Sequence, residues 1–244
     1  MLLAWDASAA DLAVARWFGH AQGFEWRDSW WASTLLHSGG RGLAWVLLAA
    51  LALAAVRTPQ STHGAPNRAQ RIGWLGAMLL CLAVVPAAKR ISATSCPWDL
   101  AEFGGIAGYV SHWQWQLADG GPGHCFPSGH AVAAFAFLGI HFMWRSHCRR
   151  RSSGWLLVVL AAGTVFGIAQ LARGAHYPSH TLWSAWACWT VCACAAWLER
   201  QAAVPSASPT TRPAADPTSL SARRSMSEKH AGLQVASPEG SGGR

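Results

Sequence analysis

The chain has 244 residues, of which 52% are hydrophobic and only 12% charged, and its formal net charge is +8. So low a charged fraction argues against a disordered chain, and no collagen-like or heptad repeat indicates a fibrous one. A basic balance can indicate nucleic-acid binding, but a nucleic-acid binder needs more polar surface than this. With 16 tryptophans as well, the composition favours a membrane protein that binds no nucleic acid.

The N-terminal segment, residues 1–36, has two interpretations. Asp6, Asp11 and Arg16 interrupt its apolar residues, which argues against a simple membrane span, and no basic region precedes it as in a signal peptide. Its leucines and tryptophans suit an amphipathic helix in the membrane interface. A sixth, polar-interrupted span is the alternative.

Five stretches are expected to be transmembrane helices, because each is, or nearly is, long enough for a hydrocarbon core of about 30 Å. In chain order they are Gly42–Val56, Ile72–Ala88, Gly129–Trp144, Gly154–Ala172 and Thr181–Leu198. The predicted fold class is therefore an all-α, polytopic membrane helical bundle over residues 1–200. The remainder, 201–244, is rich in Ser, Pro, Ala and Gly, and we expect it to be a disordered tail.

Charged residues are divided unevenly between the two faces that five spans define. The face with the N-terminal segment, Lys89–Ser128 and Arg173–His180 has six basic and seven acidic residues, whereas the other has 13 and four. By the positive-inside rule the second face, which includes the tail, is cytoplasmic. We expect an integral protein of a bacterial-type inner (plasma) membrane whose near-neutral face points outward, to the periplasm.

Three polar segments meet on the outward face. Lys89 and Arg90 end the second span, Pro127–His130 opens the third, and Arg173–His180 joins the fourth to the fifth. Lysine and arginine neutralise phosphate oxygens, and histidine transfers protons or acts as a nucleophile near neutral pH. Pro127–His130 is expected to start a helix, whose N-terminus favours an anion, and Ser179 to cap the last helix. The three segments together suit an anionic headgroup.

In order and spacing, these segments resemble the type 2 phosphatidic acid phosphatase and haloperoxidase (PAP2) superfamily, whose membrane members have about six helices. The family pattern is Lys-x6-Arg-Pro, then Pro-Ser-Gly-His, then Ser-Arg-x5-His-x3-Asp. Pro127–His130 matches the second motif completely, Lys89 matches the lysine of the first, and His176 falls on the nucleophile position of the third. The departures are Cys96 for Arg, Ala169 and Gln170 for Ser-Arg, and His180 for Asp.

The resemblance implies a membrane lipid phosphatase that hydrolyses a phosphate monoester or pyrophosphate on a lipid headgroup, without metal or cofactor. His176 is then the nucleophile that forms a phosphohistidine, His130 the acid that protonates the leaving oxygen, and His180 the partner that orients His176. The phosphate ligands implied are Lys89, Arg90, Ser128, Gly129 and Arg173. Arg173 is expected to replace the guanidinium missing at position 170. The partners implied are the lipid phosphate and the bilayer.

Other interpretations stay open from the sequence. A phosphotransferase would share the phosphohistidine, and a protein disabled by the departures would bind lipid phosphate without turnover. A zinc hydrolase would use His124, Cys125, His176 and His180, although Pro178 disfavours a continuous helical turn between the last two. Lys89 can also be an ordinary cation at the end of a membrane helix.

The remaining histidines and the cysteines carry no catalytic pattern. His20, His37, His63 and His112 are interpreted as interfacial or loop residues, and His141 as a packing residue. Cys81, Cys148, Cys188, Cys192 and Cys194 lie in spans or on the inner face, where packing or a free thiol suffices. Cys96 and Cys125 lie on the outward face, where disulfides persist. A bridge between them is predicted, with two free thiols as the alternative.

Overall fold

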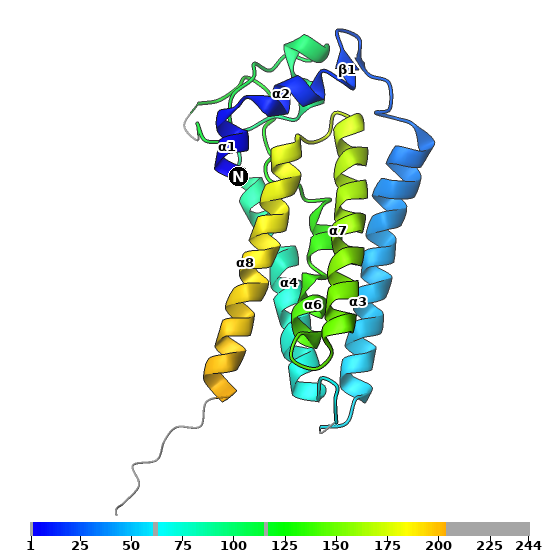
Figure 1. Cartoon of the computed structure of the whole chain (residues 1–244). Coiled ribbons are helices and arrows are strands. Elements are labelled where there is room, and N and C mark those ends of the chain that lie inside the picture. The colour runs from blue at the N-terminus through cyan, green and yellow to red at the C-terminus, as the bar shows by residue number, and fades with distance from the viewer. Residues whose placement is uncertain (1, 61–62, 115–116, 204–244) are drawn as a thin grey trace, which may run out of the picture. The chain divides into compact units, whose positions relative to one another are not determined.

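The computed structural model describes residues 2–60, 63–114 and 117–203. Almost all of the expected disordered tail therefore lies outside the described residues. Contacts group Met1–Gln201 into one unit, and the description that follows is of that unit. Its long helices lie side by side, and the N-terminal segment lies with the loop after α4 at one end of them (Figure 1). We call this the site end; α4 ends there at Arg90, and α8 begins there at Pro178.

Five helices form the bundle in the described part of the chain. They are α3 (Gly40–Arg57), α4 (Arg68–Arg90), α6 (Leu138–Trp144), α7 (Arg149–Ala172) and α8 (Pro178–Ala203). The shorter helical elements are α1 (Leu2–Ala7), α2 (Ala10–Ala15), the π-helix η1 (Trp31–Gly39), the 3₁₀ turns η2 (Pro97–Asp99) and η3 (Ala101–Phe103), and α5 (Val132–Phe135). Two-residue strands β1 (Gly19–His20) and β2 (Gly23–Phe24) pair antiparallel. The all-α fold class is thus confirmed.

Four helices among the described residues are long and apolar enough to cross a membrane: Trp31–Arg57, Arg68–Arg90, Arg149–Ala172 and Pro178–Ala202. They contain four of the five predicted spans. Large apolar side chains on them are exposed, which is expected where a helix faces lipid; examples are Leu43, Val46, Leu80, Leu157 and Trp186. Local chemistry explains where α4 begins, because the Asn67 side chain accepts from Gln70 N and Gln70 Oε1 accepts from Asn67 N, as in a capping box.

The third predicted span takes a different form. Instead of one helix over Gly129–Trp144, the chain makes a turn and then two short helices, α5 and α6. Bonds from Phe137 N to Ala134 O and from Ile140 N to Phe137 O tighten the break between them. Residues 132–143 are all buried, packed against α3, α4 and α7. Together α5 and α6 form the centre of the bundle. The apolar residues that predicted a span at this position are buried against the neighbouring helices.

The N-terminal segment forms two six-residue helices, α1 and α2, each of about 9 Å, too short to cross a membrane. They attach to the start of α8 through buried carboxylates. Asp11 accepts hydrogen bonds from Ser179 N at 3.0 Å and from Ser179 Oγ. Ser179 is therefore not the cap that the sequence predicted: its hydroxyl is a donor, and Asp11, 168 residues earlier, supplies the capping oxygens.

Asp11→Ala is expected to lower the free energy of unfolding by about 1–3 kcal/mol, because it removes a helix cap and leaves buried donors of Ser179 unpaired. The measurement is denaturant or thermal unfolding of the purified protein in detergent. Glu25→Ala is the matched control, because it also removes a carboxylate, but an exposed one. Glu25 Oε1 lies 3.8 Å from His20 Nε2. Equal stability of the Asp11→Ala protein and the control would show that Asp11 does not hold α8.

Candidate active site

The three polar segments converge at the site end, held together by their backbones. Cys125 N donates to Thr94 O at 2.9 Å, which joins the loop after α4 to the approach of α5. Trp98 N donates to Gly174 O at 2.9 Å, which joins the same loop to the α7–α8 connection. A disulfide links Cys96 to Cys125, with Cα atoms 5.2 Å apart. These bonds fix segments that are distant in sequence into one site.

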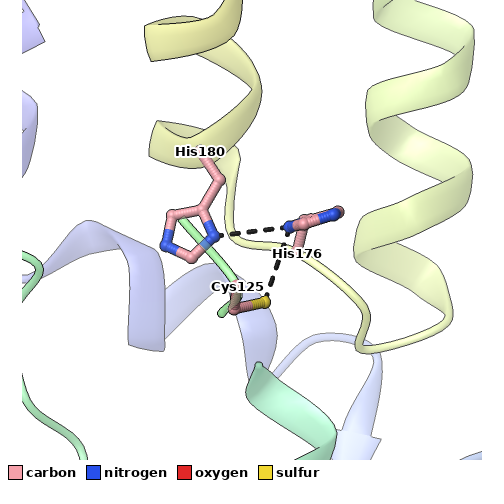
Figure 2. A group of neighbouring side chains, drawn as sticks. All are labelled: Cys125, His176 and His180. Carbon is pink, nitrogen blue, oxygen red and sulfur yellow. Dashed lines mark hydrogen bonds between the residues drawn. The ribbon is translucent and has the colours of Figure 1, made fainter. Parts of the chain in front are cut away.

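His176 is at the centre of this arrangement. It is 4% exposed and lies in the connection between α7 and α8. Its Nδ1 lies 3.5 Å from Cys125 Sγ and 3.5 Å from His180 Nδ1 (Figure 2). Burial, with the nearby charge of Lys89, lowers the pKa of His176 well below the ordinary histidine value. With Nδ1 occupied on one side of the ring, Nε2 on the other side is the atom left to react.

His180, in the first turn of α8, stands where the family has a carboxylate. The imidazole is fully buried, and its Nε2 has no hydrogen-bond partner in the structure. The rings of Tyr177 and Phe126 meet it edge to face at centroid distances of 5.1 and 5.2 Å. A neutral imidazole in this apolar setting can orient His176 through Nδ1, but it cannot supply the negative charge that a carboxylate gives.

His130 comes to the site from the turn that precedes α5. It is 6% exposed, and its Nε2 lies 3.2 Å from Leu36 O in η1. Only a protonated Nε2 can donate to that carbonyl, so Nδ1 is the atom left for proton exchange with a substrate. The first span therefore orients His130 by a backbone acceptor.

The predicted phosphate ligands have unequal positions. The Lys89 side chain passes alongside Gly129: a Cβ at residue 129 would lie 3.6 Å from Lys89 Cδ. Arg173 Nε donates to Arg27 O at 2.9 Å, and its charge still acts on His130. Ser128 N donates to His180 O at 3.1 Å, so this amide is engaged in the protein instead of facing a phosphate. Arg90 is exposed at the end of α4. Of the predicted phosphate ligands, Lys89, Gly129 and Arg173 are therefore the best placed to bind a phosphate.

Cys125, His176 and His180 offer three ligand atoms within 4.8 Å of one another, a spacing that suits a metal ion. The disulfide changes this assessment, because a bonded sulfur has no thiolate to offer. For the same reason the 3.1 Å approach of Cys125 Sγ to Ala175 O is a packing contact and not a donated hydrogen bond. His124, the fourth ligand of the zinc alternative, is exposed. Two imidazoles remain, which is too few for a structural or catalytic zinc site.

Two histidines that the sequence assigned to interfaces or loops belong to the site. The His37 ring stacks on His130 with centroids 4.4 Å apart, and its Nδ1 lies 3.2 Å from Gln170 Nε2. His112 stacks on Phe126 at 4.1 Å, and its ring lies 5.9 Å from that of His180. A signal for the first pair existed in the sequence: His37 and Gln170 are polar residues next to or within apolar membrane spans, where such residues are usually functional.

An apolar groove with a cavity volume of about 130 Å³ runs along the bundle. Its lining comes from α3, α5, α6 and α7, and includes Leu43, Leu47, Phe137, Trp155 and Phe166. The Phe166 ring, which lines the groove, lies 5.1 Å from that of His130, so the groove and the site share a wall. The side chains that line the groove are apolar.

Comparison with known proteins gives one match. A family model described as the PAP2 superfamily matches residues 71–203, more than half of the chain. The matched range contains Lys89, Pro127–His130 and His176–His180, and excludes the N-terminal segment and η1. No curated protein and no solved structure matches.

Proposed function

Because the chain belongs to the PAP2 superfamily, whose members are phosphatases or related phosphoryl-transfer enzymes acting on phosphate esters, we propose that it is an integral-membrane lipid phosphatase. It hydrolyses a phosphate monoester or pyrophosphate on a lipid headgroup, through a phosphohistidine. The observation that carries the proposal is the buried His176, held at Nδ1 by His180 and surrounded by His130 and Lys89.

The proposed reaction has two steps. His176 Nε2 attacks phosphorus, the bond from phosphorus to the lipid oxygen breaks, and His130, which enters this step protonated on both ring nitrogens, gives its Nδ1 proton to that oxygen. Water then attacks the phosphohistidine, with His130 taking a proton from it, and the bond between nitrogen and phosphorus breaks to release inorganic phosphate. Lys89 and Arg173, with the Gly129 amide, stabilise the charge that builds on the phosphoryl oxygens in both steps.

A lipid substrate is proposed because an apolar groove lies next to the site. The apolar groove between α3 and α7 begins at Phe166, beside His130, and suits the hydrocarbon tail of the phosphate ester. A soluble phosphate ester would gain nothing from such a groove. The charge distribution further supports a site on the outer, periplasmic face of a bacterial-type inner membrane, with residues 201–244 in the cytoplasm.

Replacing His180 by a carboxylate is expected to move the pH dependence of the reaction. In the native site the pKa of His176 is lowered, so the neutral nucleophile persists at lower pH than an ordinary histidine does, and the acid limb of kcat/KM is shifted in the same direction. His180→Asp places a negative charge beside His176 and raises its pKa, so the acid limb moves to higher pH by about one unit. The pH–rate profile measures this. His180→Asn is the neutral control; an equal upward shift in that protein would exclude the electrostatic explanation.

The direct test is phosphate release by the purified full-length protein from phosphatidic acid, phosphatidylglycerophosphate, a polyprenyl pyrophosphate and lipid A phosphate, with p-nitrophenyl phosphate as soluble comparison. Release from at least one lipid, inhibited by vanadate, is expected. Transfer of labelled phosphate to an added lipid or sugar without release would identify a phosphotransferase. Lipid-phosphate binding with neither reaction would identify a protein that only binds.

A further inference from the structure

The first membrane span enters the site through the π-helix η1, and it is His37 that faces the other site residues. The His37 ring stacks on that of His130 at a centroid distance of 4.4 Å and an interplanar angle of 20°. The preceding residue, Leu36, offers its carbonyl to His130 Nε2. A wide π-turn presents consecutive residues to one neighbour in a way that a regular helix does not, and such turns are frequent at functional sites. η1 therefore contributes to the site with both backbone and side chain.

The partner of His37 is the residue that departs from the family pattern. Gln170, in α7, is 2% exposed, and its Nε2 lies 3.2 Å from His37 Nδ1. The amide donates, so neutral His37 carries its proton on Nε2, at the opposite edge of the ring. Where the family has a guanidinium that binds phosphate, this chain has an amide that holds a second imidazole.

Cations surround His37. The charged groups that act on it are Arg173 from the α7–α8 connection, Arg41 from the first turn of α3 and Lys89 from the end of α4, and the neighbouring titratable ring is His130. Because these three cations repel a further positive charge, they disfavour protonation of the His37 ring. A phosphate dianion bound among them reverses the balance, because it neutralises the cations and favours an added proton.

We propose that His37 is a phosphate ligand that acts together with Arg173 in place of the guanidinium missing at position 170, and that it becomes protonated when the phosphate of the substrate binds. The proposal rests on the proposed function for its substrate, and extends the site beyond the segment that matches the family. The proton comes from solvent. Imidazolium donates from both nitrogens, so the Gln170 amide turns to accept from Nδ1 through Oε1, and Nε2 donates to a phosphoryl oxygen.

This arrangement makes anion binding depend on pH in a way that a guanidinium does not. Histidine titrates near pH 6.5, whereas arginine keeps its charge throughout the accessible range. Inorganic sulfate is a suitable probe, because it is a tetrahedral dianion that does not itself titrate between pH 5.5 and pH 8. Its affinity for the native protein is expected to fall by about tenfold across that interval.

The experiment measures sulfate binding to the full-length protein in detergent by calorimetry at several pH values. His37→Gln is expected to bind sulfate about tenfold more weakly at pH 5.5 and to lose most of the pH dependence. His37→Arg is expected to bind at pH 8 at least as tightly as the native protein does at pH 5.5. His20→Gln is the matched control, because His20 is exposed and lies outside the site.

Native affinity and pH dependence in His37→Gln would overturn the proposal. So would loss of binding at every pH in both His37→Gln and His37→Arg, since that pattern indicates a packing role. The binding readout needs no turnover, so its result is separable from the proposed function. If no lipid releases phosphate while His37→Arg flattens the sulfate profile, the phosphatase proposal fails and this inference stands.

Discussion

Replacing His176 with alanine is expected to reduce phosphate release at least about 10³-fold. The imidazole is buried, held at Nδ1 and open at Nε2, and it falls on the nucleophile position of the family pattern. Without it neither step of the proposed reaction has a covalent intermediate. The measurement is kcat for the best lipid substrate, with vesicle binding of that lipid as a second readout.

The control variants separate chemistry from folding. His130→Ala removes the acid and is expected to cost about 10²–10⁴ in kcat, and His20→Ala, outside the site, is expected to retain full activity. His176→Ala should still bind the lipid phosphate, because Lys89 and Arg173 remain. Phosphate release by His176→Ala at more than a few percent of the native rate would rule out the phosphohistidine.

Removing the disulfide is expected to have the largest effect on stability. The bridge between Cys96 and Cys125 closes a loop with a sequence separation of 29, and the chain-entropy relation gives about 3–4 kcal/mol for such a loop. An effect on activity is also expected, because Cys125 Sγ packs against His176 Nδ1 and Ala175 O. Losing the bridge frees both segments that place the nucleophile.

The variants for this test are Cys96→Ala, Cys125→Ala and the double replacement. Each is expected to unfold at lower denaturant concentration and to release phosphate more slowly, and the double replacement should be no worse than the worse single one. Cys148→Ala, in the connection between α6 and α7, is the control with a free thiol. Unchanged unfolding of the double variant would mean that the bridge adds no stability to the folded chain.

Some features of the fold could be predicted because they depend on local pattern alone. Ile72–Ala88 is an apolar run bounded by Arg71 and Lys89, and α4 extends it by four residues at the start and two at the end. The break between α5 and α6 was beyond prediction, because a helix buried on all sides has the same apolar composition as one that faces lipid. The attachment of α2 to α8 joins residues 168 apart through a buried carboxylate, which no periodicity records.

The candidate site likewise has some features that the sequence predicts and others that it does not. Motif order and topology were enough to predict that Lys89, His130 and His176 lie near one another. The engagement of the Ser128 amide with His180 O was not predictable, since it depends on how the turn before α5 packs on α8. His37 was missed because its evidence is a contact with His130, 93 residues further along the chain.

The bond from Asp11 to Ser179 has a consequence for how the enzyme is made. Synthesis proceeds from the N-terminus, so α2 leaves the ribosome long before α8, and its carboxylate cannot bind Ser179 until α8 has been made. His176, the proposed nucleophile, lies three residues before Ser179 and is held in place at the same late moment. A nascent chain therefore carries no assembled site while it is being inserted into the bilayer, because the bond between α2 and α8 forms only after all the helices between them have been made.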